Sequence, residues 1–169
     1  MFEHIGAPNY RAFFGQVRDL LTPDGVAVID SIRRMDPSAI NAPFIRKYIF
    51  PVGSIPALSE LTAAVEDSGL CSTDIEILRL HYAETLRCWR ERFLAERAAV
   101  ALMFDERFCR MWEVYLAMSE TSFRAGLHVV RQLQLTNRID TLPITQDYMV
   151  DVEREAVRPP IAGYEQARV

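Results

Sequence analysis

The chain has 169 residues, of which 50% are hydrophobic and 25% charged, and its formal net charge is -4. These values are typical of one soluble globular domain, and the acidic balance argues against general nucleic-acid binding. Three widely spaced cysteines without a CxxC pair, no apolar run of the ~20 residues that span a bilayer, and no signal-peptide pattern together predict a cytoplasmic protein without a disulfide framework, zinc site or transmembrane segment.

The first six residues, Met1-Phe2-Glu3-His4-Ile5-Gly6, place an acid and an imidazole between apolar residues and a glycine. A turn and helix-start signal, Ala7-Pro8-Asn9, follows directly. This order is typical of the ligand-bearing loop that follows a strand of a parallel sheet. Because that strand is missing, the sequence predicts that residue 1 is an interior point of a larger domain.

Residues 9–21 carry apolar side chains at helical spacing, and Pro23-Asp24-Gly25 ends that predicted helix. Val26–Ile29 is short, β-branched and without alternation, which predicts a strand buried on both faces in a parallel sheet with helices on either side. The predicted strand ends in Asp30-Ser31-Ile32, which places Asp30 at the carboxyl end, where such sheets bind ligands. The alternative is that Asp30 only caps the next segment.

Residues 33–51 contain three prolines and no sustained period, which predicts an insertion loop with a short helix around residues 44–49. The apolar residues 47–51 are expected to fold back as a lid or wall. Residues 56–69 predict a helix with Gly69 at its C-terminal cap, and residues 72–80 predict a strand.

A long helix is predicted from His81 to about residue 104, and a second one from a cap at Asp105 to Gly126. Apolar side chains at helical spacing in the second helix favour a buried stripe rather than a ligand cage. The stripe consists of Phe108, Met111, Trp112, Tyr115, Met118, Ser119 and Phe123.

Residues 128–135 alternate in polarity, which predicts a last strand at or near a sheet edge. After residue 136 the periodicity is lost and prolines and charges accumulate. The sequence therefore divides into a domain of residues 1–136 and a charged tail of residues 137–169, which we expect to be largely disordered.

Five stretches, in register and covering roughly residues 1–135, resemble the cyclopropane-fatty-acyl-phospholipid synthases. They are Met1–Gly6 with Asn9-Tyr10, residues 47–51, residues 81–86 with 89–93, residues 106–111, and residues 122–124. The resemblance implies an α/β fold. This fold would be the C-terminal part of a class I (Rossmann-like) S-adenosylmethionine-dependent methyltransferase with a long helical insertion, its N-terminal strands and cofactor loop missing.

The resemblance implies methylene transfer from S-adenosylmethionine to the cis double bond of phospholipid acyl chains, with bicarbonate removing a proton. It implies work at the inner face of the membrane, by a peripheral cytoplasmic protein. Glu3, Ile32 and Tyr82 match three of the family's bicarbonate ligands. Asp30 stands where the family has a histidine, and Arg33 where it usually has a glycine. The family's cysteine ligand and its cofactor-binding residues have no counterpart in this chain.

Asp30 changes the expected chemistry, because two acids and an anion in one pocket repel one another. Three outcomes stay open: Asp30 is protonated, Asp30 accepts the proton itself, or Arg33 restores the positive charge. Three descriptions of the whole chain also stay open. It is an enzyme, it is a truncated or split-gene fragment that needs a separate N-terminal half or a homo-oligomer, or it is a helical interaction module.

Overall fold

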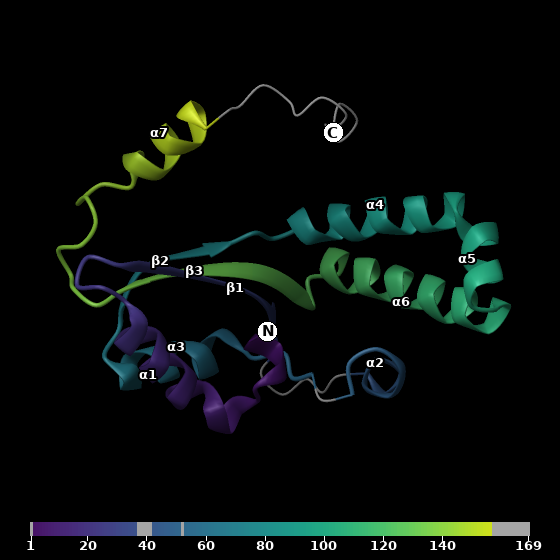
Figure 1. Ribbon diagram of the computed structural model, residues 1–169, viewed down its shortest axis with the longest axis horizontal. Coiled ribbons are helices and arrows are strands. Elements are labelled where there is room, and N and C mark those ends of the chain that lie inside the picture. Colours follow the sequence, from purple (N-terminus) through teal and green to yellow (C-terminus); the bar gives the residue numbers. More distant parts are fainter. Residues whose placement is uncertain (1, 37–41, 52, 157–169) are drawn as a thin grey trace.

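The structure is a computed structural model that describes residues 2–36, 42–51 and 53–156 (Figure 1). Its three-stranded sheet has the order β1-β3-β2, formed by β1 (Val26–Arg34), β2 (Cys71–Ile77) and β3 (His128–Thr136). Both outer strands pair antiparallel with β3. They therefore run parallel to each other, and α3 (Leu58–Ser68) lies between them in the chain as a crossover helix.

β3 does not lie at a sheet edge but next to both edge strands, which the prediction of a position at or near an edge also allowed. Val26 of β1 and Cys71 of β2 both have Thr136 as their partner, so β3 is the central strand. The alternation of polarity along β3 shows only that its two faces are covered differently, which is a local property of the strand. The neighbours of a strand depend on pairings between residues far apart in the chain, and no local pattern contains them.

The prediction that Val26–Ile29 is buried on both faces is wrong. Val26 is 41% exposed and Val28 57% exposed, whereas Ala27 and Ile29 pack against the core. Only the second face meets α1 (Tyr10–Leu20) and α3, which lie together below the sheet in Figure 1. All four residues are apolar, so the alternation of buried and exposed side chains along this strand cannot be predicted from their polarity.

The core between the sheet and the pair α1 and α3 fixes the start of the chain. Phe2, in the short 3-10 helix η1 (Phe2–His4), is 3% exposed and stacks on Tyr10 with ring centroids 4.6 Å apart. A second 3-10 turn, η2 (Ala7–Asn9), leads from it into α1. The other buried members of this core are Phe14, Leu61, Val65, Leu70, Leu133 and Leu135.

A helical hairpin follows β2 and extends from the end of the sheet (Figure 1). It comprises α4 (His81–Ala95), α5 (Arg97–Met103) and α6 (Glu106–Arg124), so the predicted single helix of residues 81–104 is interrupted at Glu96. The predicted cap of the next helix is confirmed, since Asp105 Oδ1 accepts a hydrogen bond from the Phe108 N–H at 2.6 Å. Met118 of the predicted buried stripe is 40% exposed, so that part of the prediction is wrong.

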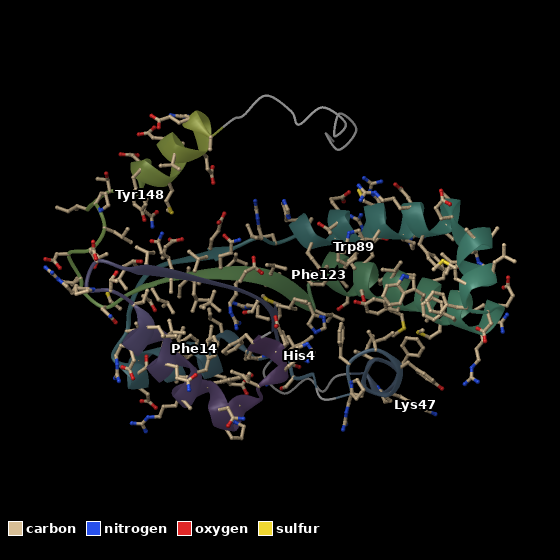
Figure 2. All side chains as sticks on the ribbon, viewed as in Figure 1. His4, Phe14, Lys47, Trp89, Phe123 and Tyr148 are labelled. Carbon is tan, nitrogen blue, oxygen red and sulfur yellow. The ribbon has the colours of Figure 1, made fainter. Side chains whose placement is uncertain are left out.

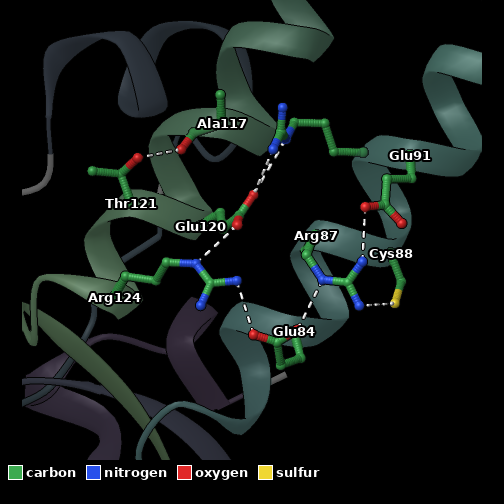
Figure 3. A network of polar contacts seen from close by, with 9 residues as sticks. Glu84, Arg87, Cys88, Glu91, Ala117, Glu120, Thr121 and Arg124 are labelled. Carbon is green, nitrogen blue, oxygen red and sulfur yellow. Dashed lines mark hydrogen bonds and ion pairs between the residues drawn. The ribbon is translucent and has the colours of Figure 1, made fainter. Parts of the chain in front are cut away.

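The hairpin is joined by a core of Ala83, Leu86, Leu116, Phe123 and Val130, and by a network of ions beside it (Figure 3). Glu120, only 8% exposed, accepts from Arg124 Nε at 2.9 Å and from Arg90 Nε at 3.2 Å. Arg124 also donates to Glu84 Oε1 at 2.8 Å. Apolar packing and buried charge thus tie α4 to α6 along the same seam.

Two further helices lie outside these layers. The predicted short helix is confirmed as α2 (Pro43–Tyr48), and α7 (Asp147–Glu155) lies within the predicted disordered tail. The prediction is wrong for α7, whose Tyr148 hydroxyl donates to Gln134 Oε1 at 2.9 Å. The domain division after residue 136 stays a prediction. Met1, residues 37–41 of the predicted insertion loop, and residues 157–169 of the predicted tail lie outside the described residues.

Candidate active site

Glu3 lies against the carboxyl end of β1. Its Oε1 accepts a hydrogen bond from the Ile32 N–H at 2.8 Å, and its own carbonyl accepts one from the Ser54 N–H at 2.8 Å. The buried Phe2 ring holds this short segment against α1. The structure therefore brings together Glu3 and Ile32, two of the four residues that the sequence singled out.

Asp30 lies on β1 opposite Gln132 of β3. The Gln132 side-chain amide donates to Asp30 Oδ2 at 3.0 Å, and Asp30 stays exposed on the face that Val26 and Val28 share. This amide is a neutral donor. Because of it, the Asp30 carboxylate is oriented but not neutralised.

Tyr82, in the first turn of α4, completes the predicted set. Its ring centroid lies 5.1 Å from that of Phe123 and 6.0 Å from that of Trp89. Burial raises the pKa of the Tyr82 hydroxyl, and the negative charges of Asp30 and Glu3 raise it further. Tyr82 is therefore a protonated hydroxyl that feels the negative charge of both carboxylates.

A row of aromatic rings runs from the α5–α6 turn to His4, the residue after Glu3. Successive centroid distances are 4.3, 6.0, 5.0, 6.2 and 5.8 Å. In order, the rings are Phe104, Phe108, Trp112, Tyr115, Phe50 and His4. Phe50, which follows α2, contacts Tyr115 of α6 on one side and His4 of η1 on the other. That residues 47–51 form a lid or wall stays a prediction. Figure 2 shows the side chains of this region, with His4 and Lys47 labelled.

The sequence reasoning missed Arg131, which is 0% exposed at the centre of β3. Burial first, and then the charge of Arg33, lower the pKa of Arg131 to about 10, whereas Glu3, Tyr10 and Glu60 act in the opposite direction. Arg33 thus lies near Arg131, on the strand face opposite Asp30. The sequence held one signal for a buried Arg131: the other residues on its face of the predicted strand are all apolar.

The described residues match some of the expected ligands and not others. No group of three or more His, Cys, Asp or Glu side chains within residues 2–36, 42–51 and 53–156 is arranged to hold a metal ion. A bicarbonate beside Tyr82 would meet one hydroxyl donor and two carboxylates, since Glu3 already occupies the Ile32 N–H. No two glycines of the chain are spaced as G-x-G, so these residues do not by themselves fit S-adenosylmethionine.

Comparison with known proteins decides the family. The profile of the family described as "Mycolic acid cyclopropane synthetase" matches residues 1–133. The chain belongs to this family. It is 42% identical over 143 residues to the tuberculostearic acid methyltransferase UfaA1 of Mycobacterium tuberculosis, covering 80% of this chain and 33% of that one. It is 35% identical over 125 residues to the cyclopropane-fatty-acyl-phospholipid synthase of Escherichia coli strain K12, covering 74% and 32%.

Solved structures of the family show the same fold. The mycolic acid cyclopropane synthase CmaA1, complexed with SAH and CTAB, superposes with a TM-score of 0.74 at 28% identity. The cyclopropane synthase MmaA2 of Mycobacterium tuberculosis superposes with a TM-score of 0.73 at 26% identity. Each match covers 79% of this chain and 52% of the other. The fold is therefore the C-terminal part of a class I methyltransferase, as the resemblance implied.

The chain spans about a third of the length of the curated relatives that it matches. Those relatives also differ in the reaction that their names give, since a sphingolipid C9-methyltransferase of Komagataella phaffii is 30% identical over 146 residues, covering 83% of this chain and 30% of its own. Membership of the family is thus shown, whereas the names of the relatives do not agree on one lipid substrate.

Proposed function

We propose that this chain supplies the acyl-binding and proton-accepting part of an S-adenosylmethionine-dependent enzyme that transfers a one-carbon unit to an unsaturated lipid chain. The row of rings from Phe104 to His4 is the observation that carries this proposal. Aromatic faces and edges give an apolar, polarisable wall along which an acyl chain packs. The row ends at His4, the neighbour of Glu3 in the chain, so we infer that an acyl chain lying on it leads towards the acidic residues.

The acidic end of the row has the groups needed to take up a proton. Forming a methylene bridge at a double bond releases one proton, and a carboxylate accepts it. Asp30 is exposed and oriented by Gln132, whereas Glu3 is held by the Ile32 N–H. We assign proton acceptance to Asp30 and positioning to Glu3. The Tyr82 hydroxyl would donate a hydrogen bond to one of these two carboxylates.

Bicarbonate as the base is the alternative that the resemblance implies. Two carboxylates around one hydroxyl disfavour a bound anion. We therefore propose that Asp30 replaces bicarbonate in this chain. A rate that rises saturably when bicarbonate is added to bicarbonate-free buffer would contradict that assignment.

The cofactor-binding residues must come from elsewhere, since the residues present do not fit S-adenosylmethionine. We propose that an N-terminal half, upstream or on a separate chain, completes the site, and that this chain alone transfers nothing.

A direct test joins this chain to the N-terminal part of the Escherichia coli relative that it does not match. The measurement is transfer of label from methyl-labelled S-adenosylmethionine to liposomes of unsaturated phospholipid. We expect transfer by the fusion and none by the unfused chain. Asp30→Asn and Tyr82→Phe should lower the rate about 10²–10⁴-fold, whereas Arg110→Gln, on the exposed side of α6, should leave it unchanged. A folded fusion that binds S-adenosylmethionine and transfers no label would overturn the proposal.

The acyl-binding role has its own test, because the chain has two tryptophans. Trp112 belongs to the row of rings, whereas Trp89 is 42% exposed on α4. With phospholipid brominated along its acyl chains, fluorescence of a Trp89→Phe variant, which keeps Trp112, should be quenched more than that of a Trp112→Phe variant. Equal quenching would show that acyl chains do not follow the row.

We also propose that the tip of the helical hairpin rests on the inner face of a membrane. Leu102, Met103 and Phe104 are 90%, 74% and 59% exposed at the turn between α5 and α6, where the row of rings begins. No helix of the described residues is long and apolar enough to cross a bilayer. Sedimentation with anionic liposomes should fall about tenfold in Met103→Glu. An unchanged bound fraction would refute contact through this tip.

A further inference from the structure

Buried hydrogen-bond donors gather on the face of the sheet that α1 and α3 cover. Nε, Nη1 and Nη2 of Arg131 make no hydrogen bond within the described residues, although the side chain is fully buried. Ser31 Oγ and Arg33 Nε are likewise buried and unbonded in that part of the chain. A buried charged group without a partner costs several kcal/mol, so proteins seldom keep one without a use.

The sheet register places these donors together. Ser31 lies directly opposite Arg131, and Arg33 follows two residues later on the same strand face. Asp30 and Gln132 belong to the opposite face, together with Ile32. The donors are therefore separated from the proposed proton acceptor by the thickness of the sheet.

The nearby acids Glu60 and Glu3 accept hydrogen bonds from other donors. Both Glu60 oxygens accept from Arg34 Nη2 at 3.0 Å, and Glu60 Oε2 also accepts the Ala57 N–H at 2.6 Å. Glu3 Oε1 accepts the Ile32 N–H, as described above. Glu60 is thus paired with another arginine, and the positive charges of Arg33 and Arg131 remain beside each other.

We propose that Ser31, Arg33 and Arg131 bind a small inorganic oxyanion of the carbonate or phosphate type. Two guanidinium groups and a hydroxyl match the lone pairs of such an anion, and a guanidinium can bind two of its oxygens at once. The bound charge offsets the repulsion between the two arginines. This site does not depend on the proposed transferase function.

Arg33 gives the anion a way in. Its side chain is half-buried, and its Nη2 donates to the Met35 sulfur at 3.1 Å. A thioether is a weak acceptor, so an oxyanion replaces it without loss. Arg33 is thus the part of the cluster nearest to solvent, whereas Arg131 is fully buried within the sheet.

Thermal unfolding of the purified 169-residue chain tests the site. Sodium phosphate and sodium bicarbonate are titrated in separate arms at constant pH, with sodium chloride holding the ionic strength. We expect a saturable rise of the melting temperature, roughly 5–10 °C at a hundredfold excess over the dissociation constant, in at least one arm. The arm that responds at lower concentration identifies the preferred oxyanion.

Arg131→Leu is the decisive variant, because leucine suits the interior of the strand. It should melt at or above the unsubstituted chain in oxyanion-free buffer and lose the response to both anions. Arg131→Lys keeps the charge without the fork and should bind about tenfold more weakly. Arg110→Leu, an exposed arginine, should respond as the unsubstituted chain does. No saturable response, or an equal response in Arg131→Leu, would overturn the proposal.

Discussion

The helical hairpin allows a direct measurement of how burial changes the contribution of an ion pair to the free energy of unfolding. Glu120 and Glu106 both lie on α6 and each meets two arginines. The Glu120 side chain is 11% exposed between Arg90 and Arg124, whereas the Glu106 side chain is 58% exposed between Arg97 and Arg110. The perturbation is Glu120→Gln, with Glu106→Gln as its matched control.

The structure sets different magnitudes for the two substitutions. A hydrogen bond to a charged partner contributes about 1.5–3 kcal/mol when it is shielded from water, and glutamine leaves one amide N–H₂ against a guanidinium. Glu120→Gln should therefore lower the free energy of unfolding by about 2–3 kcal/mol. An exposed pair contributes about 0–1 kcal/mol, so Glu106→Gln should cost no more than that.

Urea unfolding followed by circular dichroism gives both values. With a slope of about 2 kcal/mol per molar urea, the two midpoints should differ by about 1 M. Raising sodium chloride from 0.1 to 1 M shortens the screening length from about 10 to about 3 Å, which should remove the effect of Glu106→Gln and keep most of that of Glu120→Gln. Equal costs, or an equal loss with salt, would refute burial as the cause.

Three further outcomes follow from individual contacts. Phe14→Ala, at a fully buried ring, should lower the free energy of unfolding by about 3–5 kcal/mol in urea titrations, whereas Phe104→Ala, at a ring that is 59% exposed, should change it by less than about 1 kcal/mol. Burial, and then the charge of Arg34, lower the pKa of His128, so the unfolded chain binds this proton at a higher pH than the folded chain does. The free energy of unfolding should therefore fall as pH drops below about 6.5. In NMR spectra of the folded chain, the imidazole resonances should titrate below that pH. Gly69→Ala should cost about 1 kcal/mol in thermal unfolding, because φ is 80° there; a stabilised variant would contradict this.

Much of the candidate site follows from local sequence. Glu3 stands in a motif whose apolar neighbour Phe2 anchors it, and in the structure its carboxylate accepts a hydrogen bond from the Ile32 N–H. The roles of Glu3, Asp30, Ile32 and Tyr82 in catalysis stay predictions. The burial of Arg131 could not be predicted from the sequence, because it depends on α1 and α3, which cover this face of the sheet. These helices lie more than sixty residues from Arg131 in the chain.

Sequence by itself determined most of the helices, two of their caps and the family. Helical spacing, the Asp105 cap and the glycine at position 69 act within a few residues of the chain, so their effects can be predicted from the local sequence. The tertiary structure alone decided that β3 is central, that one face of β1 is exposed, and that a helix packs within the expected tail. Each of these depends on pairing between distant segments. Such pairing is set by which surfaces remain to be buried once the local elements have formed.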